Sequence, residues 1–483
     1  MPDPGWDVIV CGGGTAGPVV AARTAQAGAR VLLLEAGPDY GRLDDGRWPA
    51  ELTDASTIPT SHDWGYVSDD ARPLPFERAK VIGGCSAHNG CTVSWGHRAD
   101  YDGWGLPGWS ADELAPLFAE SSRRLRTRRF GDDELTPFHR GFIDAGAELG
   151  LPVVDDLETL DGVPGVGAEP SNSPGGIRWN AAFAYLDPVR DLPHLEVRGD
   201  TLVDRVLVQG GRAVGVRAIG PGRAVGEVAA DQIVLTAGTY GSPSILLRSG
   251  IGPAEPLRTL GVEPIVDLPG VGANLHDHPA FEVSFAPSDE LERRTAAFAV
   301  TDRAVPDEQG LAKAASSWAR DGVFDMHVFS EVAMDRRLGI FVACVTPRSR
   351  GRLSLRGLDP SAAPGLDHAY LSDPEGHDLG VLTEGIELAR RFADAPSMAP
   401  LLAGELEPGP VDDLATAIRA RVIHYWHPVG TCALGKVADE QGRIRGVDGL
   451  IVADASAIPR TPRATTNLPT IVVAERIARF LTV

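Results

Sequence analysis

The sequence is short of positive charge. It carries 45 Lys and Arg against 66 Asp and Glu, a formal net charge of −21 at pH 7. Nucleic acids and anionic membrane surfaces are bound through basic protein faces, so this balance argues against both as partners. The one basic stretch, residues 123–129, is interpreted as a solvated helix face.

Cysteine pairs and long apolar runs are also missing. The five cysteines form no C-x-x-C pair, so neither a disulfide framework nor a zinc site is indicated. No run of about 18 apolar residues occurs. The first six residues lack the basic and apolar regions of a signal peptide. We therefore expect a reduced, cytoplasmic protein.

Glycine and proline, by contrast, are abundant, with 56 and 38 residues. They predict many tight turns and long ordered loops. A chain of 483 residues is too long for one compact core and is expected to form two or three lobes.

The first 35 residues predict a dinucleotide-binding βαβ unit. Residues 7–11 are short, apolar and β-branched, which is typical of a buried strand. A glycine-rich turn follows, then a helix of small residues over 19–25. A second strand over 31–34 ends at Glu35.

Each of three glycines in this turn has a physical role in binding a dinucleotide. Gly12 permits the tight turn, Gly14 lets the pyrophosphate approach the backbone, and Gly17 lets helix and strand pack closely. The helix N-terminus, with Thr15 and Ala16, offers N–H groups to the phosphates. Glu35 is placed to accept the ribose hydroxyls. NAD and FAD would both fit this unit.

Four further segments decide between these cofactors. Taken together and in this order, they resemble the signatures of the glucose–methanol–choline (GMC) oxidoreductase family, which implies FAD as the cofactor. The segments are residues 78–104, 238–253, 269–278 and 427–456. By the same resemblance, the expected cofactor contacts beyond the glycine turn and Glu35 are Val81, Gly84, His88, Asn89, Gly90, Cys91, Val203, Asp454, Ala455 and Asn467.

The resemblance also implies a fold class and a domain organisation. We expect an α/β chain, α+β overall. A Rossmann-like FAD-binding domain over 1–155, 190–280 and 428–483 would alternate with a substrate domain over 156–189 and 281–427. Local patterns agree: 195–198, 201–208, 213–217 and 233–237 read as strands. The irregular pattern over 281–426 fits an antiparallel sheet with helices.

His88 stands just before the Asn of the first signature, where most family members have another residue. This arrangement resembles the choline-oxidase branch, in which that histidine is bonded to the flavin 8α-methyl group. Neutral imidazole is a nucleophile near neutral pH, so the chemistry is reasonable. We therefore expect a covalent flavin. The alternative is that His88 only packs or hydrogen-bonds beside the ring.

An alcohol releases hydride readily only after its hydroxyl proton has been taken, and histidine suits this task. His427 matches the catalytic His-Pro position of the family. Pro428 stiffens its loop. Tyr425 and Trp426 are expected to flank the substrate cavity, and His424 is expected to be structural.

The family usually places a second His or Asn opposite this base. Here that position falls on Thr465, which can form a hydrogen bond but cannot act as a base at neutral pH. Three explanations stay open: Thr465 binds the substrate oxygen, Asn467 does so after a shift of register, or the activity is unusual. His276, Asp277 and His278 suggest a metal site, but no further ligands follow at a suitable spacing, so none is expected.

The predicted function is oxidation of a primary or secondary alcohol by FAD, with oxygen or another acceptor taking the electrons. The alternative enzyme class is a flavin-containing lyase of the hydroxynitrile type, for which a covalent flavin would be surplus. His327, Glu331, Trp318 and Trp426 are candidates for lining the cavity. The sequence indicates neither a particular substrate nor an oligomeric state.

Overall fold

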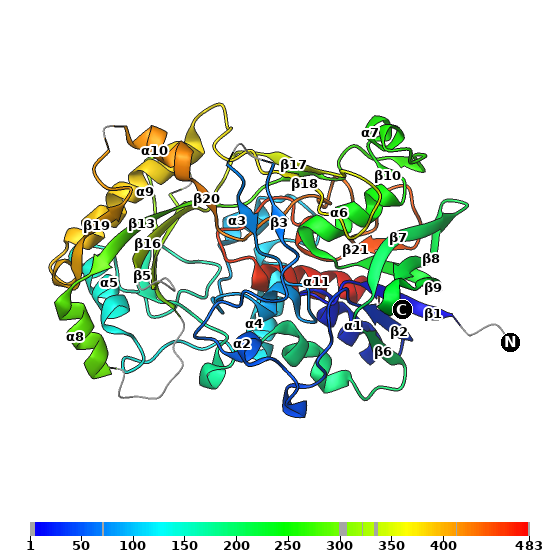
Figure 1. The fold of residues 1–483 in the computed structure, drawn as a ribbon, viewed down its shortest axis with the longest axis horizontal. Helices are drawn as coiled ribbons and strands as arrows, with labels where there is room; N and C mark the ends of the chain where they lie inside the picture. Colours follow the sequence, from blue (N-terminus) through cyan, green and yellow to red (C-terminus); the bar gives the residue numbers. More distant parts are fainter. Residues whose placement is uncertain are drawn as a thin grey trace.

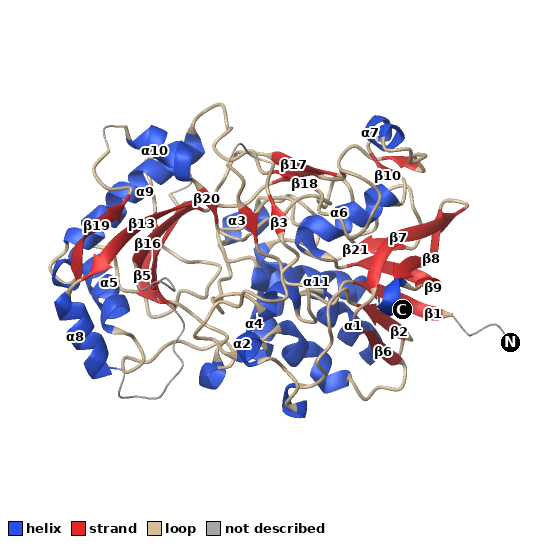
Figure 2. Cartoon of the chain, in the orientation of Figure 1, coloured by secondary structure: helices blue, strands red, loops and turns tan. Residues whose placement is uncertain are grey.

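The computed structural model describes residues 5–69, 72–298, 307–320, 322–332, 337–411 and 413–481. Two large sheets dominate this part of the chain and lie toward opposite ends of the long axis (Figures 1 and 2). Helices, loops and short strands lie in the region between them. The arrangement is the expected α/β architecture with two lobes.

The first sheet is built on parallel strands and has the order β6-β2-β1-β9-β8-β7, with β21 pairing β9. The long strand β9 pairs with β1 and β21 through its C-terminal half and antiparallel with β8 through its N-terminal half. Its strands are β1 (Trp6–Cys11), β2 (Val31–Leu34), β6 (Leu195–Arg198), β7 (Leu202–Gln209), β8 (Arg212–Ile219), β9 (Val225–Leu235) and β21 (Leu450–Val452).

Helices cover this sheet and connect its strands. α1 links the parallel neighbours β1 and β2, as a βαβ crossover requires, and α11 contacts both α1 and α4. In Figure 1, α11 runs across the centre of the molecule. These helices are α1 (Gly17–Gln26), α4 (Ala111–Arg124), α6 (Gly238–Arg248) and α11 (Asn467–Leu481).

The second sheet is antiparallel, in the order β19-β13-β16-β15-β14-β5, with β20 pairing β13. Its strands are β5 (Gly165–Ala168), β13 (Pro279–Pro287), β14 (Glu308–Ala314), β15 (Met326–Val332), β16 (Leu338–Cys344), β19 (Leu402–Glu407) and β20 (Ile423–His424). Helices on its outer side are α5 (Pro137–Glu148), α8 (Asp289–Phe298), α9 (His377–Asp394) and α10 (Leu414–Arg421).

The core of this lobe lies between the sheet and its helices. Phe142 of α5 stacks on Phe392 of α9 with ring centroids 4.5 Å apart, against the buried apolar side chains of β13 to β16. A second cluster on the sheet contains Phe329, Phe341 and Tyr425, and its Tyr425 lines a cavity that borders the sheet. The sheet therefore separates a helix-covered face from the face that borders the cavity.

Short elements complete the chain. The remaining strands and α-helices are α2 (Ala50–Thr53), β3 (Tyr66–Val67), β4 (Pro75–Phe76), α3 (Arg98–Asp102), β10 (Ile251–Gly252), α7 (Ala254–Thr259), β11 (Val266–Asp267), β12 (Ala273–Leu275), β17 (Gly351–Ser354) and β18 (Gly365–Asp367). Single helical turns are η1 (Leu43–Asp45), η2 (Gly84–Ala87), η3 (Pro174–Gly176), η4 (Ala182–Leu186), η5 (Asp187–Val189), η6 (Pro221–Arg223), η7 (Ala399–Leu401) and η8 (Ala455–Ala457).

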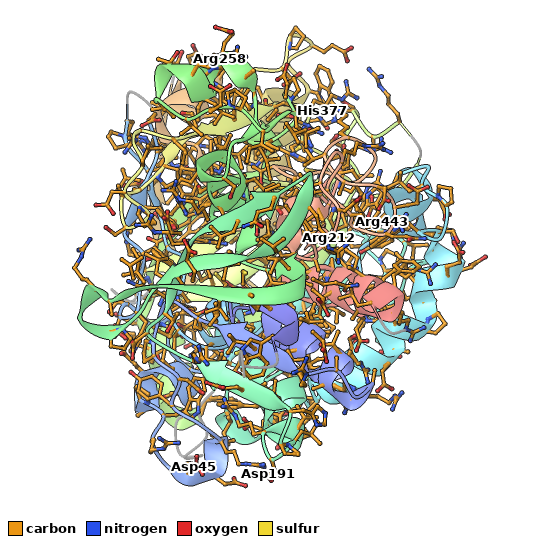
Figure 3. All side chains as sticks on the ribbon, turned by 90° about the vertical axis from the view of Figure 1, so that its right-hand side faces the viewer. Asp45, Asp191, Arg212, Arg258, His377 and Arg443 are labelled. Atoms are coloured by element: carbon orange, nitrogen blue, oxygen red, sulfur yellow. The ribbon has the colours of Figure 1, made fainter. Side chains whose placement is uncertain are left out.

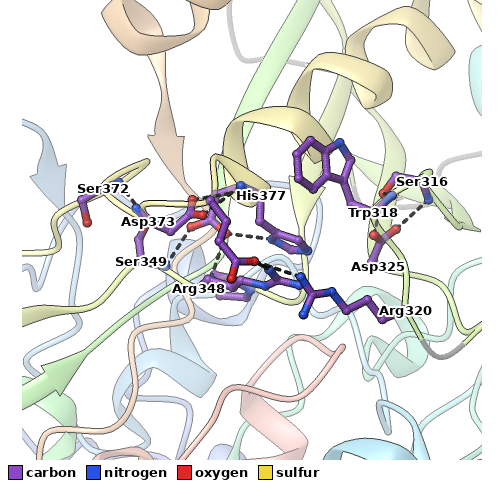
Figure 4. A network of polar contacts seen from close by, with 12 residues as sticks. Ser316, Trp318, Arg320, Asp325, Arg348, Ser349, Ser372, Asp373 and His377 are labelled. Atoms are coloured by element: carbon purple, nitrogen blue, oxygen red, sulfur yellow. Dashed lines mark hydrogen bonds and ion pairs between the residues drawn. The ribbon is translucent and has the colours of Figure 1, made fainter.

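A polar network fixes the start of α9 (Figure 4). Asp378, in the first turn, accepts hydrogen bonds from the backbone N–H groups of Arg348 (2.8 Å) and Ser349 (3.0 Å). Asp373 accepts from the N–H of His377 at 2.8 Å. Carboxylates at a helix N-terminus accept hydrogen bonds from otherwise unpaired N–H groups and interact favourably with the positive end of the helix dipole. The network ties the loop after β16 to α9.

Many charged side chains outside the core form ion pairs. At the rim of Figure 3, Asp191 contacts Arg42 at 2.5 Å and Arg258 contacts Glu255 at 2.6 Å. The basic stretch predicted as a solvated face follows the same rule. Its contacts are Arg124–Glu120 (2.8 Å), Arg128–Glu134 (2.7 Å), Arg129–Asp156 (2.7 Å) and Arg126 over the ring of Trp179 (3.6 Å).

The predicted strands of the first lobe are present as β1, β2, β6, β7, β8 and β9, and the predicted helix is α1. The exact domain limits stay a prediction. One segment sits differently from the expected division: α5, within 1–155, packs on the second sheet rather than the first.

Candidate active site

A cavity of about 750 Å³ lies between the two lobes. It extends from the turn after β1 to the inner face of the second sheet. The first lobe contributes Gly12, Gly14, Thr15, Ala16, Glu35, Gly84, His88, Asn89, Gly90, Val203, Asp454, Ala455, Thr465 and Asn467 to its wall, and the second contributes Asp307, Glu308, Glu331, Tyr425, Trp426 and His427.

The turn between β1 and α1 has the close packing expected of a dinucleotide loop. Gly12 has φ +111°, and a Cβ there would lie 2.6 Å from the carbonyl oxygen of Thr236. A Cβ on Gly17 would lie 2.0 Å from the carbonyl oxygen of Gly12. Both positions therefore require glycine. Gly14 borders the cavity, where the N-terminus of α1 offers N–H groups to an anion.

Glu35 holds this loop in shape from the end of β2. Its carboxylate accepts hydrogen bonds from the N–H groups of Gly13 (2.7 Å) and Gly37 (2.8 Å). Burial raises the pKa of Glu35 to about 7. Each carboxylate oxygen has a further lone pair, so Glu35 can also accept from ribose hydroxyls.

A second glycine segment presses against the first. A Cβ on Gly84 would lie 2.5 Å from the Cα of Gly14, so the two loops approach at backbone distance. Gly84, Asn89 and Gly90 border the cavity. Three expected contacts do not: Gly17, Val81 and Cys91 lie outside the cavity wall, and Gly17 acts through packing instead.

His88 lies on the cavity wall and is 6% exposed. Its Nε2 is 2.9 Å from the carbonyl oxygen of Ser61. A carbonyl only accepts hydrogen bonds, so Nε2 carries the proton and Nδ1 has the free lone pair. Burial lowers the pKa of His88, which keeps the imidazole neutral.

Asp454 organises the opposite wall rather than offering a free carboxylate. Its two oxygens accept from the N–H of Gly238 (2.8 Å) and of Ser456 (2.8 Å), and from the hydroxyls of Ser242 and Ser456 (2.5 Å each). These bonds join the start of α6 to η8. Val203 and Ala455 also border the cavity.

His427 is buried at the second-lobe end of the cavity, with 8% exposure. Its ring lies against the ring of Tyr425, with centroids 4.3 Å apart. The preceding residue, Trp426, has φ +58°, an unusual value for a large side chain. Both terminal nitrogens of Arg78 donate to the Trp426 carbonyl at 3.1 Å, which stabilises this backbone.

Two residues on the segment before β13 complete the surroundings of His427. Oδ1 of Asp277 accepts from the backbone N–H groups of His427 (2.9 Å) and His278 (2.7 Å). Nδ1 of His278 lies 3.1 Å from Nδ1 of His427. Burial lowers the pKa of His427 well below its usual range, with neighbouring His278 and Arg78 adding to the effect. The imidazole is therefore neutral.

Thr465 and Asn467 lie on the cavity wall near the start of α11. The Thr465 hydroxyl donates to the carbonyl oxygen of Thr92 at 3.3 Å. Oδ1 of Asn467 accepts from the Thr15 hydroxyl at 3.4 Å. Nδ2 of Asn467 is buried and has no hydrogen-bond partner among the described residues, so it is available to a bound group.

The second-lobe end of the cavity is acidic. Asp307 directly precedes β14, and Glu308 is the first residue of β14. Glu331 lies opposite Glu308 on the paired strand β15. Burial raises the pKa of Asp307 to about 6 and that of Glu331 to about 7. The hydroxyl of Tyr425 is buried beside them without a partner in the described part of the chain.

A group of possible metal ligands lies away from this cavity. The ligand atoms of Cys344, His377 and Asp378 lie within 4.8 Å of one another. Asp378 already accepts from two backbone N–H groups and lies 3.1 Å from Nδ1 of His377. These hydrogen bonds account for the contacts of His377 and Asp378.

The site contains residues that the sequence did not indicate. Asp277 and His278 were set aside with the rejected metal site, and Asp307 and Glu308 were not considered. His278 and His427 are 149 residues apart in the chain, so no local sequence pattern predicts their contact. Glu331 and Trp426 line the cavity as suggested, whereas His327 and Trp318 do not.

The parallel sheet, its glycine loop and the adjoining cavity define a dinucleotide-binding enzyme. The two GMC oxidoreductase family models match residues 6–280 and residues 347–474. The chain therefore belongs to the GMC oxidoreductases, and it is an FAD-dependent oxidoreductase.

Relatives resemble the chain over its whole length. The oxygen-dependent choline dehydrogenase of Burkholderia pseudomallei (strain 1710b) is 31% identical, over 98% of this chain and 93% of the relative. Choline oxidase of Arthrobacter globiformis is 31% identical, over 100% of this chain and 95% of the relative. The crystal structure of pyridoxine 4-oxidase from Mesorbium loti superposes with a TM-score of 0.88 at 28% identity, covering 98% and 99%.

The residues present fit FAD. The N-terminus of α1 faces the cavity where a pyrophosphate would need N–H donors, and Glu35 lies at the end of β2. Nδ2 of Asn467, which has no partner in the described part of the chain, and the buried imidazole of His88 belong to residues that border the same space. None of the helices in the described ranges has the length and apolar character needed to span a bilayer.

Proposed function

We propose that the chain oxidises an alcohol to the corresponding carbonyl compound, with His427 as the general base. When bound, FAD supplies the hydride acceptor. The observation that carries the proposal is a neutral, buried histidine on the wall of the cavity that also contains the dinucleotide loop. The relatives named for choline and pyridoxine oxidation support an alcohol as the substrate class.

His427 removes the proton from the hydroxyl oxygen of the substrate, which allows hydride to leave the carbon that bears this hydroxyl group. Its neutral state is maintained by burial, and its position is fixed by Asp277 and by the ring of Tyr425. Thr465 lies on the same wall and offers one hydroxyl to the substrate oxygen. Oxygen or another acceptor then removes the electrons.

We further propose that His88 bonds covalently to the flavin 8α-carbon. This attachment would break one C–H bond of the 8α-methyl group and leave the flavin reduced by two electrons, which oxygen or the other electron acceptor would remove. The His88 ring borders the cavity beside Asn89 and Gly90, is neutral, and has a lone pair on Nδ1. A neutral imidazole is a competent nucleophile. The resemblance of residues 85–89 to the choline-oxidase variant of the family signature supports the same attachment.

The acidic end of the cavity supports a substrate that carries positive charge as well as a hydroxyl group. Asp307, Glu308 and Glu331 offer carboxylates, and Trp426 offers an aromatic face. The hydroxyl of Tyr425, for which the described residues provide no partner, adds an acceptor. An ammonium group gains from both kinds of contact, through charge pairing and cation–π attraction. Two relatives are named for choline, which is such a molecule.

Anaerobic mixing of the purified holoenzyme with a panel of neutral and cationic alcohols tests this function. We expect loss of the oxidised flavin absorbance with at least one alcohol and recovery on addition of air or a redox dye. The faster of the two acceptors assigns oxidase or dehydrogenase. An unbleached flavin together with cleavage of a hydroxynitrile would instead establish the lyase.

A further inference from the structure

Two imidazoles meet nitrogen to nitrogen beside the cavity. Nδ1 of His278 and Nδ1 of His427 are 3.1 Å apart, and the rings are nearly perpendicular at 86°. A hydrogen bond across this contact needs one protonated and one unprotonated nitrogen. The pair therefore has two neutral arrangements, which place the shared proton on opposite residues.

The hydrogen bond at Nε2 of His278 determines which of the two arrangements forms. This Nε2 lies 3.1 Å from the carbonyl oxygen of Pro462, which can only accept. Nε2 must therefore carry a proton. Burial lowers the pKa of His278 to about 3, so the ring holds no second proton near neutral pH. Its Nδ1 is left as an acceptor, and the N–H of the contact belongs to His427.

The hydroxyl of Thr461 also lies 3.1 Å from Nε2 of His278. A hydroxyl can donate or accept, so this contact is compatible with either arrangement. The Pro462 carbonyl is compatible with only one. The backbone carbonyl, rather than the threonine, decides the direction of the chain of hydrogen bonds.

We propose that His278 is a positioning residue that holds His427 in the tautomer protonated on Nδ1, leaving Nε2 as the unprotonated nitrogen that serves as the base. The inference rests on the proposed role of His427. Asp277 supports it by bonding the backbone N–H of both histidines through one oxygen. When Nε2 of His427 takes the substrate proton, the Nδ1–H bond to His278 stays in place and strengthens, because its donor has become charged.

Histidine side-chain ¹⁵N resonances measure this tautomer directly, without turnover. In holoenzyme labelled on histidine, with the His427 signals identified by their loss in H427N, we expect a protonated Nδ1 and an unprotonated Nε2 at pH 7. In H278L, where no acceptor remains, we expect the His427 signals to shift toward the other tautomer. A wild-type His427 that is protonated on Nε2 would overturn the proposal.

Two variants separate the positioning role from simple packing. In H278N, the amide oxygen can still accept from His427, so flavin reduction should stay within about threefold of wild type. In H278L it should slow about tenfold to a hundredfold, as loss of a histidine's outer hydrogen-bond partner does. T461V should remain close to wild type, because the Pro462 carbonyl is untouched. Equal rates in H278N and H278L would contradict the proposal, even where both bind flavin normally.

The outcomes also distinguish this inference from the proposed function. If H427N reduces its flavin as fast as wild type, His427 is not the base and the proposed mechanism fails. If H427N is inactive but H278L retains the wild-type rate and the wild-type His427 resonances, His427 is still the base, and His278 is not a positioning residue. Loss of the flavin absorbance would show that H278L is misfolded. In that case, the flavin-reduction rate of H278N and the ¹⁵N measurement on the wild-type protein test the positioning role.

Discussion

At the scale of single residues, His427 and Thr465 share one cavity wall but differ in chemistry. His427 can take a proton near neutral pH, whereas Thr465 can only form hydrogen bonds. We expect His427→Ala to slow flavin reduction by about 10² to 10⁴, the range typical of a lost general base, while FAD stays bound. Thr465→Ala should cost about tenfold or less. Stopped-flow absorbance of the holoenzymes measures both, and equal losses would contradict the assigned roles.

His88 gives a second prediction at this scale. Wild-type protein unfolded in acid should retain the flavin absorbance and the added mass of FAD, because a C–N bond survives denaturation. His88→Asn should release the flavin under the same treatment. His194→Asn is the matched control, since His194 bonds the carbonyl oxygen of Ala25 and does not line the cavity. Flavin released from wild type would show that His88 only contacts the ring.

The residues that the sequence located best are those whose role follows from local backbone geometry. Gly12 and Gly17 occupy positions where a Cβ would meet backbone atoms, and this demand is visible in the spacing of the glycines. His278 could not be found in this way. Its role depends on the partner nitrogen of His427 and on the carbonyl of Pro462, both far away in the chain. Val81 and Cys91 show the converse: they belong to the motif but lie outside the cavity wall.

At the scale of elements, the pairing of β14 with β15 brings two carboxylates together at the cavity. Glu308 and Glu331 are partners in register. Burial and the neighbouring carboxylates raise the pKa of Glu308, and a bound cation would favour the ionised forms of both residues. We expect Glu331→Gln to raise the KM for choline about tenfold, equivalent to about 1.4 kcal/mol of binding free energy. The effect on kcat should be smaller, because the proposal assigns Glu331 to the charge of the substrate and His427 to removal of the proton. Steady-state kinetics with oxygen or a dye as acceptor measures both constants.

A neutral analogue of the same shape provides the control for this prediction. In 3,3-dimethylbutan-1-ol a carbon replaces the charged nitrogen of choline. Wild type should prefer choline, and Glu331→Gln should lose most of this preference while its KM for the neutral alcohol changes little. A wild-type enzyme that favours the neutral analogue would show that the acidic end of the cavity does not bind the substrate's charge.

The two sheets differ in how far their strands could be predicted. β1 and β2 are short apolar runs next to glycine turns, and the βαβ order identifies them. The strands of the second sheet were expected only as a sheet with helices. β16 is buried at every position and β14 at nearly every one, so no alternation of polar and apolar residues marks them. Such runs cannot be told from buried helix by periodicity.

At the scale of the whole molecule, function depends on how the lobes meet. The sequence predicted two lobes and which motifs bind the dinucleotide. The acidic end of the cavity was not predicted, because it forms only where β14 and β15 face loops of the first lobe. The position of α5 on the second sheet has the same origin: its apolar face, with Phe138 and Phe142, fits the core beneath that sheet.

The buried titratable groups of the protein predict how its stability depends on pH. Burial raises the pKa values of Asp307, Glu331 and Glu169 to about 6, 7 and 8. Below their unfolded values these carboxyls are neutral in both states. As pH rises, the unfolded chain loses their protons first, so their contribution to stability is lost progressively up to about pH 8. Buried His139, His278 and His424, with pKa values lowered to about 3, act oppositely: their contribution is lost as pH falls below about 6.5.

Between pH 6.5 and 8 only the carboxyls among these groups still bind protons differently in the two states. We therefore expect the midpoint of thermal unfolding of the holoenzyme to fall over this interval, as followed by circular dichroism at constant ionic strength. Choline should raise the midpoint more at pH 8 than at pH 6, because a bound cation pairs with ionised carboxylates. Glu169→Gln should flatten the fall above pH 7. A midpoint that rises from pH 6.5 to 8 would mean that these carboxylates are already ionised and paired within the folded protein.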